Sequence, residues 1–396
     1  MTTPAARPRL SRETIVLGVI GFFVMVGFGV VIPVLPVFVR DFGVGFAEVG
    51  AVISAFALMR LVAASFVGKL VDRFGERLIL SLGIGIVAVS TALTGVAQSY
   101  AEVLLWRGLG GIGSAMFSIS AMSLLLVTTA PSLRGRAVGF YQGGFLLGGM
   151  TGPAIGGFLA AISLRAPFFF YAGMLLVAGV IGVLLLRSPS RHTRDAGDPQ
   201  QAPIPFRVVL SDRRYRAALV ANLAVGWSSF GVRTALIPVL VVEVLHESTV
   251  WTGIAIAVAA VAQTLALAPA GRFVDMVGRR PAIIGAFTLA GAVMMAIPFA
   301  PDIWVLIALV SAYGVAAAFM GTAPAAAVGD AAGGRTGQPV AFFSAVSDVG
   351  AILGALVAGL LVDAVSFHAA FATALLLLAI AAGYALLRMP RAFARA

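Results

Sequence analysis

The sequence contains no cysteine and few charged side chains. Without cysteine, the chain has neither a disulfide framework nor a thiolate metal site. Charged residues make up 11% of the 396 residues, whereas a soluble domain carries roughly a quarter. Because 60% of the residues are hydrophobic, water would solvate such a surface poorly, and lipid is the expected solvent.

Several functional signatures are also missing. No Gly-x-x-x-x-Gly-Lys-Ser/Thr run is present, so the sequence shows no phosphate-binding loop for ATP. His192, His246 and His368 are too far apart to indicate a metal site, and no buried His or pair of buried acids is available to an intramembrane enzyme. The net charge of +11 comes from scattered basic runs, which argues against nucleic-acid binding. We expect no enzyme, no cofactor and no metal.

Long apolar runs dominate what is present. A membrane-spanning helix needs about 20 apolar residues. Twelve runs reach this length, at 14–38, 46–70, 78–97, 101–128, 137–161, 167–187, 216–243, 250–272, 281–300, 303–328, 338–362 and 367–388. We therefore expect an all-α membrane protein made of a tail (1–13), an N-terminal six-helix bundle (14–187), a linker (188–215), a C-terminal six-helix bundle (216–388) and a second tail (389–396).

Lysine and arginine gather on one side of these expected spans. The N-terminal tail, the linker and the connections after the even-numbered spans hold most of them, whereas the opposite connections hold Arg40 and Arg165. Basic loops remain in the cytoplasm during insertion. The sequence therefore predicts a multi-pass protein of the cell membrane with both termini in the cytoplasm.

A ten-residue pattern occurs twice, 203 positions apart, at 68–77 and 271–280. The repeat extends further, because Gly50 matches Gly253, and Gly148, Gly152 and Gly157 match Gly350, Gly354 and Gly359. Each half contains an even number of spans, so the two halves have the same polarity. We expect a pseudo-two-fold axis along the membrane normal to relate them.

Four patterns resemble the major facilitator superfamily, and within it the twelve-span drug:proton antiporters. The chain departs from the family at Glu76, where a basic residue is usual. The residues that carry the resemblance are Gly27 and Pro33 to Pro36 in the first span, Gly68, Asp72, Arg73, Gly75 and Arg77 after the second, Arg107 to Gly113 in the fourth, and Gly148, Gly152, Pro153, Gly156 and Gly157 in the fifth, the antiporter motif.

The resemblance implies two bundles that rock around a central cavity lined by spans 1, 4, 7 and 10. It places span 2 against span 11 and span 5 against span 8. It implies a monomer in membrane lipid that exports lipophilic or amphipathic small molecules by proton antiport.

The carboxylate of Asp72 has two interpretations. As a conformational latch it would face the N-terminus of span 11 near Pro339 and gain from the helix dipole. Arg73 and Arg77 would brace it. The alternative is a solvated charge in a loop. The fifth-span glycines likewise suit tight packing or the sealing of the two halves.

Charged residues inside the expected spans are costly and often functional. Asp348 and Arg60 lie at a similar depth, about 12–15 Å from the basic side, so we expect an ion pair between the halves. Asp348 and Arg60 are candidates for proton coupling, and a static buried pair is the alternative interpretation. The resemblance adds Arg107, which matches an arginine of the family that is often linked to proton coupling. Pairing with a backbone carbonyl and binding an anionic substrate are the alternatives for Arg107.

A second set of residues suits a substrate cavity. Arg233 follows aromatic residues in the seventh span, which favours an amphipathic or anionic ligand. Snorkelling toward the outer headgroups is the alternative for Arg233. The cavity candidates are Arg233, Trp227, Asn222, Phe230, Gln142 and Tyr141. The intramembrane arginines also leave open a facilitator or exchanger of organic anions.

Overall fold

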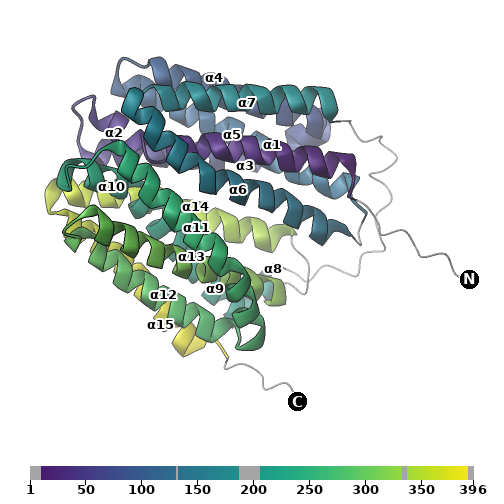
Figure 1. Ribbon diagram of the computed structural model, residues 1–396. Helices are drawn as coiled ribbons and strands as arrows, with labels where there is room; N and C mark the ends of the chain where they lie inside the picture. The colour runs from purple at the N-terminus through teal and green to yellow at the C-terminus, as the bar shows by residue number, and fades with distance from the viewer. Residues whose placement is uncertain (1–9, 131–132, 187–205, 332–336, 391–396) are drawn as a thin grey trace, which may run out of the picture.

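The computed structural model describes residues 10–130, 133–186, 206–331 and 337–390, and these residues form helices and connections without a strand (Figure 1). The N-terminal bundle contains α1 (Arg12–Val31), α2 (Leu35–Arg40), α3 (Phe46–Phe74), α4 (Glu76–Val96), α5 (Tyr100–Thr128), α6 (Arg134–Ile162) and α7 (Ala166–Leu185). After α8 (Phe206–Ser211), the C-terminal bundle contains α9 (Arg213–Val225), η3 (Gly226–Val232), α10 (Arg233–Val239), η4 (Leu240–Val244), α11 (Thr249–Met276), α12 (Arg279–Ala296), η5 (Ile297–Phe299), α13 (Ile303–Ala331), α14 (Gly337–Ala364) and α15 (Phe367–Arg388).

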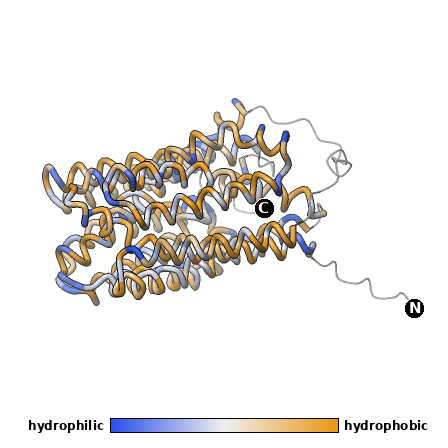
Figure 2. The backbone as a smooth tube through the Cα atoms, turned by 90° about the horizontal axis from the view of Figure 1, so that it is seen from above, coloured by the Kyte–Doolittle hydropathy of each residue, from blue (hydrophilic) through white to orange (hydrophobic). Residues whose placement is uncertain are grey.

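The expected number of membrane spans is confirmed. Within the described residues, 12 helices are long and apolar enough to cross a membrane. Figure 2 shows apolar residues along the lengths of these helices. Large apolar side chains such as Ile162, Leu184 and Leu387 are exposed on the outside of the molecule. Such a surface is stable when lipid covers it.

Polar side chains and glycines set where helices begin. Ser11 accepts a hydrogen bond from the backbone N–H of Thr14 at 3.1 Å, which satisfies a donor that the first turn of α1 leaves free. Gly75 separates α3 from α4, and Gly278 occupies the equivalent place before α12. Their φ values are +86° and +115°, a conformation that favours glycine. The repeated pattern thus forms the same turn in both halves.

The first and seventh spans differ although each contains the same Ile-Pro-Val-Leu sequence, at 32–35 and 237–240. α1 ends at Val31 and α2 begins at Leu35, so the expected continuous span 14–38 is interrupted around Pro33. Pro238 instead lies inside α10, between the π-helical segments η3 and η4. Proline removes a backbone donor in either setting. In the seventh span the wider π turns absorb this loss without ending the helix.

Helix packing repeats from one half to the other. α1 packs on α6 and α7, and α4 packs on α5 and α7. Correspondingly, α9 packs on α14 and α15, and α12 packs on α13 and α15. Between the halves, α3 packs on α14 and α6 packs on α11. The fold is the expected one: two six-helix bundles related by a pseudo-two-fold axis, with span 2 against span 11 and span 5 against span 8.

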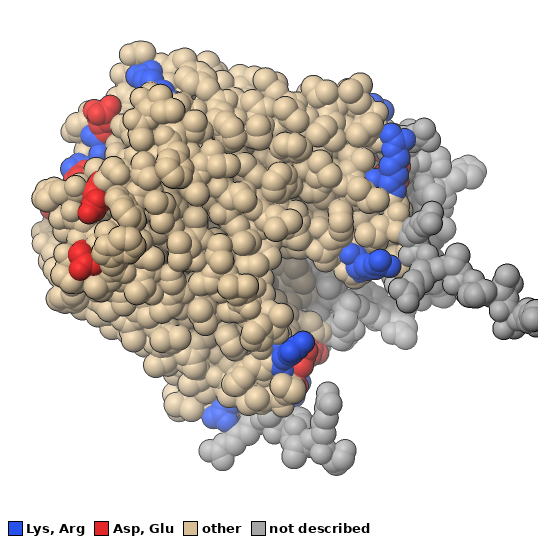
Figure 3. Space-filling view, in the orientation of Figure 1, with Lys and Arg blue, Asp and Glu red and all other residues tan. Residues whose placement is uncertain are grey.

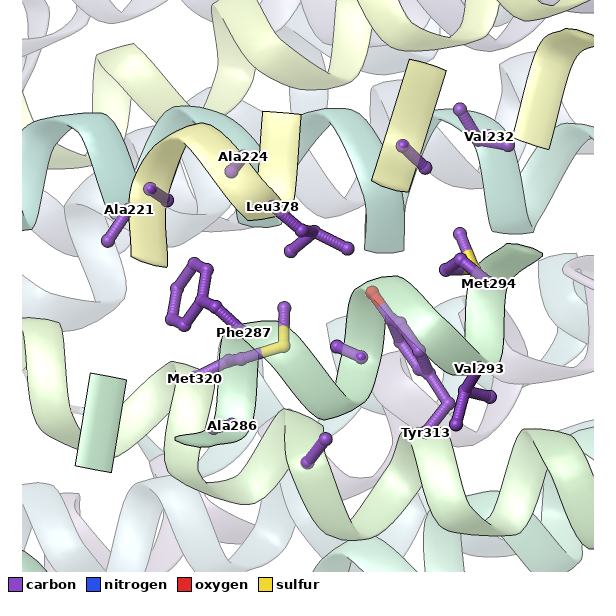
Figure 4. Close-up of a cluster of buried hydrophobic side chains, with 14 of the residues drawn as sticks. Ala221, Ala224, Val232, Ala286, Phe287, Val293, Met294, Tyr313, Met320 and Leu378 are labelled. Carbon is purple, nitrogen blue, oxygen red and sulfur yellow. The ribbon is translucent and has the colours of Figure 1, made fainter. Parts of the chain in front are cut away.

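Each bundle has its own apolar core. In the C-terminal bundle, Phe287, Met320 and Leu378 pack together near Tyr313 (Figure 4). Lipid tails are as apolar as these side chains, so removal from water does not hold the helices together within the bilayer. Close packing and hydrogen bonds between helices hold them instead.

The start of α1 and the end of α15 lie at the same end of the molecule (Figure 1). We name this end the terminus face and the opposite end the far face. On the side drawn in Figure 3, the charged side chains at the terminus face are mostly basic, whereas those at the far face are acidic and basic together. Most of the expected tails and linker lies outside the described residues. In their described parts, α1 already begins at Arg12 and α9 at Arg213.

Candidate functional site

α3 and α14 run antiparallel along the interface between the bundles. Toward the far face, Gly359 of α14 lies against the backbone of Phe46, and Gly50 of α3 lies against the backbone of Ala355. A Cβ at either glycine would overlap a carbonyl oxygen, so glycine lets the two backbones touch. The bundles are closed against each other in this region.

Two polar contacts reinforce this closure at the far face. Arg40 donates from Nε and Nη2 to the two carboxylate oxygens of Glu243 at 2.8 and 3.0 Å. This hydrogen bond raises the pKa of the Arg40 guanidinium. Asp363 of α14 accepts hydrogen bonds from the backbone N–H groups of Phe46 and Ala47 at 3.0 and 2.7 Å. Both contacts join the N-terminal bundle to the C-terminal one.

Deeper along the same helix pair, Arg60 and Asp348 form an ion pair between the bundles. The Asp348 side chain is 18% exposed and the Arg60 side chain 40% exposed. The Arg60 Nε is buried without a hydrogen-bond partner among the described residues. The structure thus brings together the two charges that the sequence places at a similar depth.

Beyond this ion pair the bundles part toward the terminus face. Phe66 and Phe74 of α3 and Phe342 of α14 are exposed. Figure 3 shows the surface hollowed between the bundles on this side. Asp72 is exposed, and no described residue forms a hydrogen bond or ion pair with it. The conformation is therefore closed at the far face and open at the terminus face.

The other residues of the expected latch lie around the turn that follows α3. Arg77 donates to the backbone carbonyl of Val183 in α7. The Arg73 guanidinium lies 5.4 Å from the centroid of the Phe74 ring. Gly68 has open space where a Cβ would be, and Gly75 forms the turn. In this conformation neither arginine braces Asp72.

Arg107 of α5 is a buried cation. It is 7% exposed, and its guanidinium lies 4.5 Å from the centroid of the Phe56 ring. Its Nε has no hydrogen-bond partner, and no carboxylate of the described residues pairs with it. A lone buried cation is costly within a membrane, which favours a functional reason for its presence.

Arg233 occupies a polar cluster in the C-terminal bundle. Its guanidinium lies 5.3 Å from the centroid of the Tyr313 ring, and its Nε donates to the Ser229 carbonyl at 3.4 Å. The Tyr313 hydroxyl is hydrogen-bonded to the hydroxyls of Ser229 and Ser228 at 2.7 and 3.0 Å. Within the described part of the chain this arginine also has no carboxylate partner. A cation beside hydroxyl groups suits a polar or anionic group of a ligand.

The remaining cavity candidates have different surroundings. The Trp227 indole N–H donates to Thr373 of α15 at 3.0 Å, and the Asn222 amide donates to the Phe343 carbonyl of α14 at 2.6 Å. Both residues are therefore engaged inside the C-terminal bundle. Phe230 is 56% exposed.

The candidates from the fifth span lie in the other bundle. Tyr141 is buried, with its ring centroid 4.8 Å from that of Phe145. The next residue, Gln142, is exposed. The described contacts do not join either residue to Arg233.

The glycines of α6 contact two different partners. Gly148, Gly152 and Gly156 lie against the backbone of α1 within their own bundle. Gly157 instead lies against Gly253 of α11 in the other bundle. The three glycines therefore serve packing inside the N-terminal bundle, and Gly157 serves contact between the bundles.

The matching glycines of the second half behave in the same way. Gly350 and Gly354 lie against the seventh span, whereas Gly359 reaches α3 of the N-terminal bundle. Pro153 takes part in the α6–α11 contact, because its carbonyl oxygen lies against Gly253. The repeat seen in the sequence is thus a repeat of contacts.

Sequence reasoning missed the contacts at the far face. Arg40 and Glu243 are 203 positions apart, which is the offset of the repeat. They therefore occupy matching positions of the two halves, and this match could have indicated their pairing. Sequence reasoning singled out Glu76 but did not predict that this side chain is buried and accepts a hydrogen bond from Ser123 at 3.2 Å. The signal there was the departure from the family pattern. For Asp363, the sequence offered no feature other than its charge that could have indicated its contact with α3.

A hollow of about 330 Å³ lies elsewhere, between α4 and α7. Apolar and small residues line it, with Ser81 as the polar exception. None of the charged residues described above borders it. Among the described residues, no group of three or more His, Asp and Glu is placed to hold a metal ion.

Sequence comparisons identify relatives of this chain. A model of the Major Facilitator Superfamily matches residues 17–262 and 218–395. The chain is 28% identical over 221 residues to Quinolone resistance protein NorA of Staphylococcus aureus (strain MRSA252), covering 56% of this chain and 57% of that protein. It is 33% identical over 171 residues to Multidrug resistance protein 1 of Bacillus subtilis (strain 168), covering 43% and 44%. The chain thus spans about half the length of these curated relatives.

Solved structures share the fold over nearly the whole chain. A bacterial homolog of the human lysosomal transporter Spinster, in an inward-facing and unoccupied conformation, has a TM-score of 0.80 at 18% identity, covering 99% of this chain and 100% of that chain. The nucleoside transporter NupG has a TM-score of 0.74 at 12% identity, covering 94% and 98%. The family match, the twelve spans and the paired bundles show that this chain belongs to the Major Facilitator Superfamily, a family of membrane transporters and not of enzymes.

Proposed function

We propose that this chain exports lipophilic or amphipathic small molecules from the cell by proton antiport, as a monomer that alternates between two open states. The names of two relatives, which refer to resistance to quinolones and to multiple drugs, support an exporter of such molecules. Two bundles that are related by symmetry and have separate cores support alternating access by rocking.

The observation that carries the proton coupling is the Arg60–Asp348 pair. A carboxylate joins such a pair when it has given up its proton, and Asp348 is paired while the terminus face is open. Binding of a proton would neutralise Asp348 and break this contact between the bundles. Proton release to the open side is therefore linked to the contact that joins α3 and α14.

The orientation follows from charge. Lys and Arg gather at the terminus face, so we place this face and both chain ends in the cytoplasm. The conformation described above is then open to the cytoplasm. Asp72 is free in this state, as proposed for a latch that closes the cytoplasmic face in the outward-open state.

For the solute, we place the substrate beside the polar cluster of Arg233. Phe230 precedes Arg233 by three residues and is exposed, so it offers an aromatic surface in the same span. We include Trp227 and Asn222 of this span in the proposed site, together with Gln142 and Tyr141 of the opposing bundle. Arg107 contributes positive charge from α5.

The test uses purified protein in liposomes with an imposed pH gradient and a fluorescent quinolone as solute. Asp348→Asn should lower gradient-driven uptake by roughly ten-fold or more, an effect of about 1.4 kcal/mol. Binding of the quinolone should change little, because the substrate contacts remain. The matched control is Asp330→Asn, which removes the ion pair to Arg279 within one bundle and should leave uptake unchanged. Full gradient-driven uptake by Asp348→Asn would refute this mechanism.

A second candidate function rests on a different observation. Arg107 and Arg233 are intramembrane cations without a carboxylate partner among the described residues. Two such cations suit a facilitator or exchanger of organic anions. In the same liposomes, uphill uptake of an anionic fluorophore that needs a counter-substrate and survives an uncoupler would favour this function over proton antiport.

A further inference from the structure

Asp363 joins the two bundles through the end of a helix. It lies in the last turn of α14, and its carboxylate accepts from the first two backbone N–H groups of α3, those of Phe46 and Ala47. N–H groups at a helix start have no partner within the helix, and the helix dipole favours a negative charge there. The residue that caps α3 thus comes from the opposite bundle.

An aspartate also occupies the corresponding position on the other helix of this pair. Asp72 is 26 positions after Phe46, the first residue of α3, and Asp363 is 26 positions after Gly337, the first residue of α14. The two helices are antiparallel, so each aspartate lies at the end of the pair where the partner helix begins. At 1.5 Å per residue, the two ends are about 39 Å apart.

The contacts between α3 and α14, along the length that separates Asp72 from Asp363, support this register. Gly50 lies beside Ala355, and Ser54 donates to the Ile352 carbonyl at 2.8 Å. Asp72 is 18 residues after Ser54, which is five full helical turns at 3.6 residues each, so both occupy the same face of α3. This face is the one that α14 covers.

We infer that Asp363 is a positioning residue that holds the far face closed, and that Asp72 and Asp363 act as reciprocal latches at the two ends of the α3–α14 pair. When the far face is closed, Asp363 caps α3 and Asp72 is free, as observed. When the bundles rock, the contact at the far face opens and Asp72 meets the first turn of α14. Because one cap forms as the other breaks, the two caps contribute similar free energies to the two open states.

This inference concerns which face is closed and holds for any solute or coupling ion. The test is therefore a measurement of conformation. The chain has no cysteine, so spin labels can be placed at chosen pairs of exposed residues without background. Leu78→Cys with Met276→Cys reports the terminus face, and Ala101→Cys with Phe299→Cys reports the far face. The distances between the two spin labels are measured by double electron–electron resonance on the full chain in lipid nanodiscs.

Asp363→Ala should raise the ratio of far-face-open to terminus-face-open molecules by roughly five-fold, the effect of losing one helix cap. Asp363→Asn should act in the same direction by a smaller factor, because its amide oxygen still accepts a hydrogen bond but carries no charge to interact with the helix dipole. Asp72→Ala should lower the ratio by roughly five-fold. The double variant Asp72→Ala with Asp363→Ala should return the ratio to within about two-fold of the unmodified chain.

The matched control is Asp302→Ala at the same face. Asp302 accepts from the backbone N–H of Val305 at 2.9 Å, so it caps a helix of its own bundle and does not join the two bundles. Its loss should leave the ratio unchanged. The inference is overturned if Asp363→Ala leaves the ratio unchanged, if Asp302→Ala shifts it equally, or if the double variant does not compensate. Because the readout needs no solute or pH gradient, such a failure is distinct from a failure of proton antiport.

Discussion

Arg107 is the residue whose burial is hardest to explain by stability alone. Its guanidinium lies over the Phe56 ring, where a cation–π contact offsets part of the cost of burial. No carboxylate of the described residues pairs with Arg107 to offset the rest of this cost. Arg165 provides a contrast, since it donates to the carbonyls of Gly95 and Ala97 at 3.1 Å. The first arginine costs stability, and the second contributes to it.

Replacing Arg107 by methionine should therefore stabilise the chain and impair transport. Methionine fills a similar space without a charge to desolvate. The midpoint of thermal unfolding should rise by about 2 °C or more, and gradient-driven uptake in liposomes should fall by roughly ten-fold or more. The control Arg165→Met should do the reverse, lowering the midpoint while leaving uptake intact. A lower midpoint with normal uptake for Arg107→Met would show that this arginine is structural.

At the scale of the element, α6 shows how one glycine-rich helix serves two interfaces. Gly156 and Gly157 are neighbours in sequence, yet they face α1 and α11. In an α-helix, adjacent residues point about 100° apart, so a run of glycines contacts two helices at once. Gly139 of the same helix has open space where a Cβ would be.

Alanine substitutions at these three glycines should have three different effects. Gly156→Ala should lower the free energy of unfolding by about 1–3 kcal/mol, because the new methyl group overlaps the Val30 backbone. Gly139→Ala should raise it by roughly 0.5–1 kcal/mol, because alanine favours the helix. Gly157→Ala should weaken contact between the bundles and shift the distances measured at the far face toward opening. Denaturant titration and spin-label distances check these effects, and equal destabilisation by all three would contradict the assignment.

At the scale of the whole molecule, each half folds its own core and the two halves touch along α3–α14 and α6–α11. These contacts lie toward the far face and rest on glycines, on Arg40–Glu243 and on Asp363. Small-residue contacts and exposed polar contacts can break without disturbing either core. Rocking as rigid bodies is therefore the motion that this architecture permits.

Cysteine labelling on cells tests both the orientation and this motion. An impermeant maleimide should label Asp41→Cys, at the far face, on intact cells. It should label Met276→Cys, at the terminus face, only after lysis. In inside-out vesicles, Phe342→Cys should react rapidly in the resting state and several-fold more slowly when a solute and a pH gradient drive closure of the terminus face. Labelling of Met276→Cys on intact cells would reverse the proposed orientation, and an unchanging rate at Phe342→Cys would exclude the motion.

Much of the fold was predictable because lipid imposes a simple rule on the chain. Backbone groups in a bilayer must pair within their own helix, so runs of about 20 apolar residues become spanning helices. The repeat predicted the symmetry, and its glycines proved to make equivalent contacts in both halves. The break around Pro33 was not predictable, since the matching Pro238 lies within a helix whose π segments accommodate it.

The candidate site was predictable in part. The depths of Arg60 and Asp348 suggested their pairing, because depth follows from counting residues along a helix. The directions of side chains such as Trp227 and Tyr141 were not available from the sequence, since the rotation of each helix depends on its neighbours. Both residues proved to be engaged within their own bundles.

The sequence by itself determined that the chain spans a membrane, that it consists of two similar halves, and which charges lie at which depth. These properties depend on hydropathy and spacing along one helix at a time. Only the tertiary structure decided which face is closed, that Gly157 and Gly359 join the bundles, and that Asp363 caps a helix of the opposite half. Those contacts depend on the relative placement of two rigid bodies, which local sequence does not encode because more than one placement satisfies the same helices.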